Sequence, residues 1–323
     1  MGATTDIDQR HLARAIDLAE SGRGRVSPNP MVGAVITRDE QILGEGFHGS
    51  LGGPHAEVEA ILAASDHDLS GATLYVSLEP CNHHGTTPPC TDAILAAGVE
   101  RVVFGARDPN PAAAGGETRL RAQGVDVEYV DSWAARTQNE AWRTWVRERR
   151  PFVIYKVAAT LDGRVVVPGA RFVTGEESRR LVHELRAEVD AVAVGGGTAR
   201  VDRPRLDARD VATPKGQPRR LVFSRGPLPD GLDLELRIGP LAAELGLLAA
   251  DGVQSLLLEG GPTLASAFLE ADLVDKLLVF VAPVLAGHGP SPTASLPSPR
   301  TLSHLTARPV GADVLLQAYV HDP

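Results

Sequence analysis

The amino-acid sequence predicts an α/β protein of two domains. At 323 residues the chain is long enough for two cores, and 43% of its residues are hydrophobic. In both halves, short apolar runs typical of buried strands alternate with stretches that carry apolar residues at helical spacing. Such alternation favours sheets with helices on their faces. We place the domain boundary close to residue 150, which gives predicted domains at residues 1–150 and 151–323.

The first domain is predicted to open with a helix that Asp8 caps and that ends near Gly22. Further helices are predicted from His55 and at residues 92–97, 118–123 and 132–149. The last of these is polar with a basic end, and Pro151 is expected to stop it. Apolar runs between turn signals predict strands at residues 31–37, 42–47, 73–78, 99–104 and 125–130.

The second domain is predicted from a fresh run of the same signals after Pro151. Strands are predicted at residues 152–159, 191–194, 220–223, 255–259, 276–281 and 313–319. Helices are predicted at residues 176–188 and 263–270. The proline-rich stretch at residues 290–299 predicts a surface loop.

The composition argues against several classes of protein. A net charge of −9 disfavours a protein that coats nucleic acid. No apolar run approaches the roughly 20 residues that span a bilayer, and the amino terminus lacks the basic and apolar segments of a signal peptide. The only two cysteines, Cys81 and Cys90, suit a reducing compartment and a metal site better than a disulfide. We therefore expect a cytoplasmic protein without a membrane or nucleic-acid partner.

The most specific signal is a set of residue types that bind metal. Glu57 follows His55 by two residues, and Cys81 and Cys90 lie in a loop after a predicted strand. One imidazole and two thiolates leave a tetrahedral Zn²⁺ with an open position for water, which is typical of a catalytic site. His-x-Glu followed by Pro-Cys is the pattern of zinc-dependent nucleobase deaminases, in which the Glu moves protons and does not bind metal. Zinc would lower the pKa of its water to about 7.

Each of these residues also has a plainer interpretation. His55 would be a surface histidine, the cysteines ordinary thiols, and Glu57 a carboxylate favoured near a helix start. On spacing alone, His83 and His84 compete as ligands. They lie too close to Cys81 for comfortable chelation, so we expect them to face substrate or to hydrogen-bond within the loop.

A proline-flanked asparagine precedes the first predicted strand. The fixed φ angles of Pro28 and Pro30 present the Asn29 amide rigidly. Asn29 would hydrogen-bond the edge of a substrate ring, or it would simply form a turn. The sequence alone leaves both interpretations open.

Two glycine-rich loops follow predicted strands of the second domain, at residues 195–197 and 260–261. Glycines there let backbone amides approach a phosphate, and a helix amino terminus adds a favourable dipole. Tight strand-to-helix turns also use glycine for steric reasons alone. The dinucleotide-binding fingerprint is absent, because Arg200 occupies the place of its third glycine.

Taken together, the motifs resemble the bifunctional riboflavin-biosynthesis deaminase–reductase family, over nearly the whole chain. In the first domain they are PNPMVG at 28–33, HAEV at 55–58, EPCNH at 79–83, GTTPPC at 85–90 and DPNP at 108–111. Eight residues separate the two cysteines, where most nucleobase deaminases have two. In the second domain they are residues 156–164, Gly197-Thr198 with the spaced Asp202, Pro204 and Leu206, and EGGPTL at 259–264.

The resemblance implies a fold and a reaction. The fold would be a cytidine-deaminase-like three-layer α/β/α domain followed by a dihydrofolate-reductase-like α/β domain. The reaction would be zinc-dependent deamination of a pyrimidinone ribosylamine 5′-phosphate, a small-molecule substrate derived from GTP, followed by NADPH-dependent reduction of its ribosyl group to ribityl. We also expect a homo-oligomer.

The resemblance also implies roles for individual residues. Zinc would bind His55, Cys81 and Cys90, with Glu57 as the proton shuttle. Contacts with the deaminase substrate would come from Asn29, His48, His84, Asp108 and Asn110. Contacts with NADPH would come from Ala159, Thr174, Thr198, Asp202, Ser224, Gly261, Pro262, Thr263, Leu264, Ala265, Ser266 and Ala267. The substrate of the reductase would meet Arg186, Leu206, Arg209 and Glu259, with the two arginines suited to its phosphate.

Three positions affect the expected cofactor site. Arg225 follows a predicted strand where an adenosine 2′-phosphate could lie, so we expect it to favour NADPH over NADH; a solvated loop arginine is the plainer interpretation. Two positions depart from the family pattern. Arg203 stands where a second aspartate is common, and Phe172 stands where tryptophan is common, after a short segment.

Two other functions are consistent with parts of the sequence. One is a zinc-dependent deaminase that acts on tRNA or another nucleic acid, with a non-catalytic second domain. The charge of −9 and the wide cysteine loop argue against it. The other is a zinc-stabilised scaffold, against which Glu57 argues, since a structural zinc site needs no proton shuttle.

Overall fold

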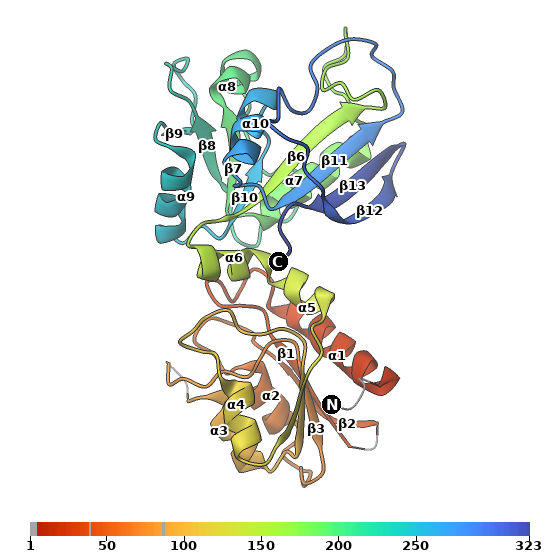
Figure 1. The fold of residues 1–323 in the computed structure, drawn as a ribbon, viewed down its shortest axis with the longest axis vertical. Helices are drawn as coiled ribbons and strands as arrows, with labels where there is room; N and C mark the ends of the chain where they lie inside the picture. The colour runs from red at the N-terminus through yellow and green to blue at the C-terminus, as the bar shows by residue number, and fades with distance from the viewer. Residues whose placement is uncertain (1–4, 39, 86–87) are drawn as a thin grey trace. The chain divides into compact units, whose positions relative to one another are not determined.

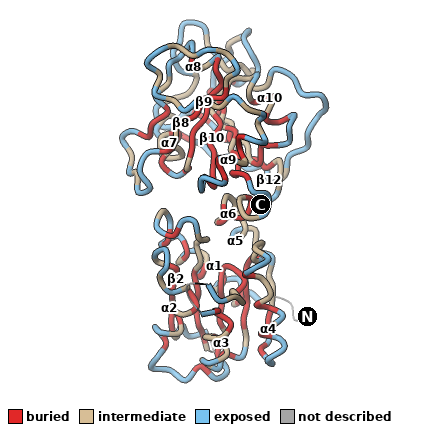
Figure 2. The backbone as a smooth tube through the Cα atoms, turned by 90° about the vertical axis from the view of Figure 1, so that its left-hand side faces the viewer, coloured by how far each residue is buried: buried red, intermediate tan, exposed pale blue. Residues whose placement is uncertain are grey.

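The computed structural model describes residues 5–38, 40–85 and 88–323. The chain divides into two compact units, of which the first ends at Arg147 and the second begins at Glu148. Each unit is built around its own sheet (Figure 1). The buried residues of each unit lie mainly along its strands and on the helix faces that cover them (Figure 2).

Within the described residues, the sheet of the first unit has five strands in the order β2-β1-β3-β4-β5. β1 is antiparallel to both of its neighbours, whereas β3, β4 and β5 run parallel. The strands are β1 (Gly33–Arg38), β2 (Gln41–Phe47), β3 (Thr73–Val76), β4 (Arg101–Phe104) and β5 (Asp126–Tyr129). The carboxyl ends of β3 and β4 therefore open onto the same edge of the sheet.

Helices cover both faces of this sheet. Ile36 of β1 packs in a cluster with residues of α2 (Ala56–Ala63), α3 (Cys90–Ala97) and α4 (Gly116–Ala122). The next residue toward the amino end, Val35, points to the other face and packs against α1 (Asp6–Ala19). This alternation follows from the two-residue period of a strand. The first unit is a three-layer α/β/α sandwich, as the resemblance implied.

The first helix begins with a different cap from the predicted one. Thr5 is the N-cap residue, and its hydroxyl accepts the backbone N–H of Asp8. Asp8 lies at the third helical position, and its carboxylate accepts the Thr5 N–H in return, which completes a capping box. Burial opposes ionisation of Asp8, but hydrogen bonds from Arg101, Thr5 and Tyr75 outweigh it and hold its pKa below the usual range. The prediction that Asp8 itself caps the helix was wrong.

The predicted single helix at residues 132–149 was also wrong. The structure has α5 (Trp133–Gln138) and α6 (Glu140–Glu148), with Asn139 between them. The buried Asn139 amide accepts the N–H of Met31 at 2.9 Å and donates to its carbonyl oxygen at 2.8 Å. An asparagine side chain that pairs with distant backbone competes with helical hydrogen bonding, which explains the break.

The sheet of the second unit has eight described strands, in the order β12-β13-β11-β6-β10-β7-β8-β9. The strands from β11 to β9 are parallel, and the antiparallel strands β13 and β12 extend the sheet beyond β11. The strands are β6 (Phe152–Thr160), β7 (Ala191–Gly195), β8 (Arg219–Phe223), β9 (Glu235–Arg237), β10 (Ser255–Leu258), β11 (Lys276–Ala282), β12 (Ser303–Val310) and β13 (Asp313–Tyr319).

This second sheet is also covered on both faces. The larger core cluster joins alternate residues of β6, β7, β8 and β10 to α9 (Leu241–Ala250) and α10 (Pro262–Glu270). The opposite face packs against α7 (Glu176–Glu188) and α8 (Gly196–Asp202). Four elements of the second unit were not predicted, because each lacks a clear sequence signal. Helix α8 starts with two glycines and α9 is apolar on most sides, whereas β9 has only three residues and β12 is an exposed edge strand.

The longest helices of the described residues are α1 and α7, with 14 and 13 residues. None of the described helices combines the length and the apolar character that a membrane crossing requires.

A glycine in β2 allows α2 to pack directly on the sheet. A Cβ atom on Gly46 would lie 2.5 Å from the carbonyl oxygen of Ala56 and closer still to the backbone nitrogen of Ala60. Because these neighbours are backbone atoms, Gly46→Ala must push α2 away. We expect a loss of roughly 1–3 kcal/mol in the free energy of unfolding, measured by chemical denaturation.

The control for this prediction is Gly49→Ala, because the nearest atom to its added methyl group belongs to the Phe47 ring, at 3.6 Å. Gly49→Ala is expected to leave the unfolding midpoint unchanged. Equal midpoints for both variants would show that the close approach of β2 and α2 is not required.

Candidate functional site

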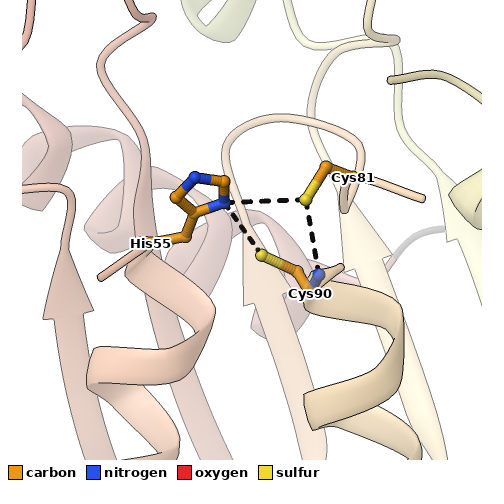
Figure 3. A group of neighbouring side chains, drawn as sticks. All are labelled: His55, Cys81 and Cys90. Atoms are coloured by element: carbon orange, nitrogen blue, oxygen red, sulfur yellow. Dashed lines mark hydrogen bonds between the residues drawn. The ribbon is translucent and has the colours of Figure 1, made fainter. Parts of the chain in front are cut away.

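Three side chains that are distant in sequence meet at one edge of the first sheet. His55 is the N-cap residue of α2, Cys81 lies in the loop after β3, and Cys90 is the first residue of α3. Nδ1 of His55 lies 3.1 Å from Sγ of Cys90 and 3.6 Å from Sγ of Cys81 (Figure 3). The three ligand atoms all lie within 4.8 Å of one another. The first residues of two helices and the loop after β3 therefore bring three possible metal ligands close together.

The donor set fits a catalytic zinc ion. Two thiol groups and one imidazole provide three ligands of the kinds that zinc prefers, with the fourth position left for water. The hydrogen bond with Cys90 is the main cause that lowers the pKa of Cys81, and the same bond raises that of Cys90. The backbone N–H of Cys90 also donates to Sγ of Cys81 at 3.3 Å, as the amino terminus of α3 would favour a thiolate.

Glu57 lies beside this cluster but is not one of its donors. It occupies the first turn of α2, and only 3% of its surface is exposed. Burial raises the pKa of Glu57 to about 7, with the neighbouring Cys81 as a second cause. A carboxyl group that titrates near neutral pH can both accept and return a proton.

His55 and Cys81 of the cluster, together with Glu57, line a cavity of about 340 Å³, large enough for a small heterocycle with a substituent. Polar groups from five segments line it, and two tryptophans of α6 supply an apolar wall. The lining residues include Asn29, His48, His55, Glu57, Glu79, Cys81, His83, Asp108, Asn110, Trp142, Trp145 and Val146.

Asn29 and His48 form a hydrogen-bonded pair on one side of the cavity. The His48 Nδ1 atom lies 2.9 Å from the carbonyl oxygen of Pro54, so Nδ1 carries the hydrogen and donates it. Nε2 of His48 must then accept a hydrogen bond from the Asn29 amide nitrogen, at 3.3 Å. This arrangement orients the Asn29 side chain and leaves its carbonyl oxygen as the acceptor.

Asp108 and Asn110 line another side of the cavity. Oδ1 of Asp108 accepts the backbone N–H of Asn110 at 2.8 Å, and Oδ1 of Asn110 accepts that of Ala112 at 3.1 Å. Burial raises the pKa of Asp108 to about 6. These side-chain bonds shape the loop that both residues share.

The two adjacent histidines of the cysteine loop point in different directions. His84 is 78% exposed, its Nε2 lies 4.0 Å from a carboxylate oxygen of Asp92, and it does not line the cavity. His83 lines the cavity, and its buried Nδ1 has no hydrogen-bond partner among the described residues. Thr86 and Thr87, part of the GTTPPC motif, lie outside the described residues. The lining residues Glu79, Trp142, Trp145 and Val146 were not among the predicted site residues.

In the second unit, the glycine-rich loops lie side by side. β7 and β10 are parallel neighbours, so their carboxyl ends and the starts of α8 and α10 meet at one edge. A Cβ atom on Gly261 would lie 3.4 Å from the hydroxyl oxygen of Thr198, whereas one on Gly197 would meet open space. Two helix amino termini there present free N–H groups, an arrangement suited to the phosphates of NADPH.

The other predicted cofactor contacts differ in exposure. Ser224 adjoins Gly196 at the end of β8, whereas Arg225 and Asp202 are exposed. In α10, Ala265 is buried, and the buried hydroxyl of Ser266 accepts the N–H groups of Ala294 and Ser295. The first turn of α10 is therefore better placed to meet a ligand. Ala159 is buried in β6, and Thr174 lies just before α7.

Arg186 and Glu259 form a charged pair near the carboxyl end of β10. Nε and Nη2 of Arg186 donate to the two carboxylate oxygens of Glu259 at 2.6 and 3.0 Å, and Lys156 lies 3.8 Å from the same carboxylate. Arg209 donates to Asp207 at 2.7 Å and is partly exposed. Leu206 is only 2% exposed, so its side chain belongs to the core and it could meet a ligand only through its backbone.

Comparisons with known proteins decide the family. Residues 5–106 match the model of the cytidine and deoxycytidylate deaminase zinc-binding region, and residues 151–316 match that of the RibD C-terminal domain. The riboflavin biosynthesis protein RibD of Synechocystis is 36% identical to this chain, over 97% of the chain and 96% of that protein. The chain belongs to the RibD family.

The similarity to RibD structures extends over both units. Form 1 of Acinetobacter baumannii RibD has a TM-score of 0.84 at 33% identity, and the match covers 97% of this chain and 98% of that one. The Thermotoga maritima diaminohydroxyphosphoribosylaminopyrimidine deaminase/5-amino-6-(5-phosphoribosylamino)uracil reductase has a TM-score of 0.81 at 34% identity, with the same coverage. The predicted fold class, a cytidine-deaminase-like unit followed by a dihydrofolate-reductase-like unit, is confirmed.

Membership of the RibD family establishes the class of activity. The chain is a bifunctional enzyme of riboflavin biosynthesis, with a zinc-dependent deaminase in the first unit and an NADPH-dependent reductase in the second. The alternative of a nucleic-acid deaminase with a non-catalytic second domain is not favoured, because the second unit matches the RibD C-terminal domain over residues 151–316.

Proposed function

We propose that the first unit deaminates 2,5-diamino-6-ribosylamino-4(3H)-pyrimidinone 5′-phosphate and that the second unit then reduces the ribosyl group of the product to ribityl. The observation that carries this proposal is the convergence of His55, Cys81 and Cys90 beside the buried Glu57, at a cavity that His55, Cys81 and Glu57 line. The activity named for the Thermotoga maritima protein supports this choice of substrate.

In the deaminase cavity, each group has a distinct task. His55, Cys81 and Cys90 would hold a zinc ion, which when bound would make a polarised water available at neutral pH. Glu57 accepts a proton and returns it to the departing amine, for which its pKa of about 7 is suited. The Asn29 carbonyl oxygen, oriented through His48, accepts a hydrogen bond from the ring.

The remaining polar groups of the cavity contact the ribosyl part of the substrate. The His83 ring lines the cavity, as do Asp108 and Asn110, whose side chains offer polar atoms to the ribose hydroxyl groups. We assign His83 a substrate contact on this basis. His84 stays a proposal from sequence alone, since its side chain is exposed beside Asp92.

In the reductase unit, NADPH supplies the hydride. Backbone N–H groups in the first turns of α8 and α10 bind its phosphates, from Gly196 to Thr198 in α8 and from Thr263 onward in α10, because Pro262 has no N–H. Arg209 binds the phosphate of the deaminated substrate. Arg186 is proposed as a second phosphate contact. Lys156 and Arg186 share the one carboxylate of Glu259, so these three groups keep one positive charge for a phosphate.

Three further properties belong to the proposal. The thiols of Cys81 and Cys90 bind zinc only when reduced, which supports the cytoplasm as the compartment. The charge of −9 supports a small-molecule enzyme without a nucleic-acid partner. We also propose a homo-oligomer, to be tested by sedimentation of the purified chain.

The proposed function is tested by incubating the purified chain with the diaminopyrimidinone substrate, with and without NADPH. We expect ammonia release in both samples and NADPH oxidation only after ammonia has been released. Ammonia release from tRNA that weakens steeply with salt, and none from the small molecule, would instead support a nucleic-acid deaminase.

Cofactor choice provides a separate prediction. Arg225 is exposed and directly follows Ser224, whose side chain adjoins Gly196 at the start of α8. Charge-assisted hydrogen bonds to a 2′-phosphate contribute about 1.5–3 kcal/mol each, so Arg225→Ala should weaken NADPH use roughly ten- to a hundredfold. NADH use, measured in the same variant with deaminated substrate, should stay unchanged. Equal losses with both cofactors, or no loss with either, would remove Arg225 from the site.

A further inference from the structure

The loop that brings Asp108 into the deaminase cavity is held at one peptide bond by two buried charged side chains. Nη1 of Arg143 donates to the carbonyl oxygen of Arg107 at 2.7 Å. The backbone N–H of Asp108 donates to Oε2 of Glu79 at 3.3 Å. Because this carbonyl and this N–H belong to the same peptide unit, the cation lies at the negative end of the peptide dipole and the carboxylate at the positive end.

Glu79 also accepts hydrogen bonds from the backbone farther along the segment that contains Asp108, residues 108–117. Its second oxygen, Oε1, accepts the backbone N–H groups of Gly115 and Glu117 at 3.1 and 3.2 Å. Glu79 is 6% exposed and lies two residues before the zinc ligand Cys81. One carboxylate therefore fixes the Asp108 segment against the loop that carries Cys81.

Arg143 is difficult to explain by stability alone. It is 8% exposed, its Nε has no hydrogen-bond partner among the described residues, and the partner of its Nη1 is a neutral carbonyl. Burial lowers the pKa of Arg143, and Arg147 and Arg136 lower it further, whereas Tyr129 and Asp108 act in the opposite direction. A buried cation that donates to a neutral carbonyl costs free energy that an apolar side chain would avoid, and a carboxylate that offsets part of this cost is that of Asp108 itself.

The helix that carries Arg143 also forms a wall of the cavity. Trp142, Trp145 and Val146 of α6 line it directly, so the backbone around Arg143 is fixed relative to the substrate. We propose that Arg143 and Glu79 are positioning residues for deamination: together they orient the peptide between Arg107 and Asp108 and so aim the Asp108 carboxylate at the substrate. This inference rests on the proposed contact between Asp108 and the ribosyl phosphate substrate.

The first test separates positioning from catalysis. Arg143→Met keeps an unbranched side chain of similar length but removes the hydrogen bond to the Arg107 carbonyl. We expect KM for deamination to rise about tenfold while kcat changes by less than about threefold, since a misplaced binding group weakens substrate binding without removing proton transfer. Zinc content and reduction of deaminated substrate should match those of the unaltered chain.

The matched control is Arg147→Met, which removes a positive charge from the next turn of the same helix. Its KM is expected to stay within about twofold of the unaltered value, because the hydrogen bond to the Arg107 carbonyl comes from Arg143 and is kept in this variant. A similar rise in KM for both variants, or an unchanged KM for Arg143→Met, would overturn the proposal. Should Arg143→Met fail to fold, Glu79→Gln disturbs the same peptide from its N–H end and is expected to raise KM likewise.

A double-mutant cycle tests whether Arg143 acts through Asp108. If it does, Arg143→Met combined with Asp108→Ala raises KM no further than Asp108→Ala alone. Multiplicative effects would show that Arg143 acts on the substrate by another route and would overturn the proposal. Ammonia release by the unaltered chain reports on the proposed function independently, so the two failures are distinguishable.

Discussion

Glu57→Gln is expected to keep its zinc and to lose deamination by roughly 10²–10⁴-fold, the usual contribution of a general acid–base group. Glu57 is buried beside His55, Cys81 and Cys90 but is not one of the three metal donors. Glutamine has nearly the same shape and cannot shuttle a proton. The measurements are zinc per chain by atomic emission and the initial rate of ammonia release.

The control is reduction of deaminated substrate, which should be unchanged in Glu57→Gln because the second unit has its own sheet and site. Loss of zinc together with activity would show that Glu57 binds the metal. Ammonia release close to that of the unaltered chain would show that another group moves the proton.

Cys81→Ser and Cys90→Ser are expected to lower the zinc content and to abolish ammonia release. A hydroxyl is a poor substitute for thiolate on zinc, and each replacement leaves only two of the three donors. Reduction of deaminated substrate should survive in both variants. Stoichiometric zinc in both variants would rule out this ligand set, and loss of both activities would indicate misfolding of the chain.

The zinc cluster is the part of the site that the sequence predicts best. Only two cysteines occur in the chain, and His55 and Glu57 share one helical turn, so few arrangements of these residues are possible. The motif also predicts that Glu57 stays off the metal, and the structure places it beside the donors without being one of them. The assignment of the individual site residues stays a prediction until variants are measured.

The roles of residues in irregular loops are predicted less well, because the sequence does not show which way each side chain points. His83 and His84 are neighbours, yet one lines the cavity and the other is 78% exposed. Leu206 came from the resemblance as a substrate contact, but its side chain is buried in the core. A family resemblance assigns a contact to a residue, but it does not say whether the side chain or the backbone of that residue makes the contact.

Hydrogen bonds between residues that are far apart in the sequence also cannot be predicted from sequence patterns. The break between α5 and α6 depends on Asn139 and Met31, which are 108 positions apart. The two ends of the Arg107–Asp108 peptide are held by Glu79 and Arg143, from a loop and a helix that no periodicity connects. The fold class was predictable because it depends on repeated apolar patterns, whereas these contacts depend on single side chains.

Zinc removal followed by reconstitution tests the central claim, that two chemistries occupy two separate units of one chain. The chain is stripped with a chelator, and ammonia release and NADPH oxidation are measured with deaminated and undeaminated substrate. We expect stripped protein to release no ammonia, to oxidise NADPH at the normal rate with deaminated substrate, and to recover ammonia release when zinc is restored. Ammonia release that persists without metal, or NADPH oxidation that falls in parallel with it, would contradict the account.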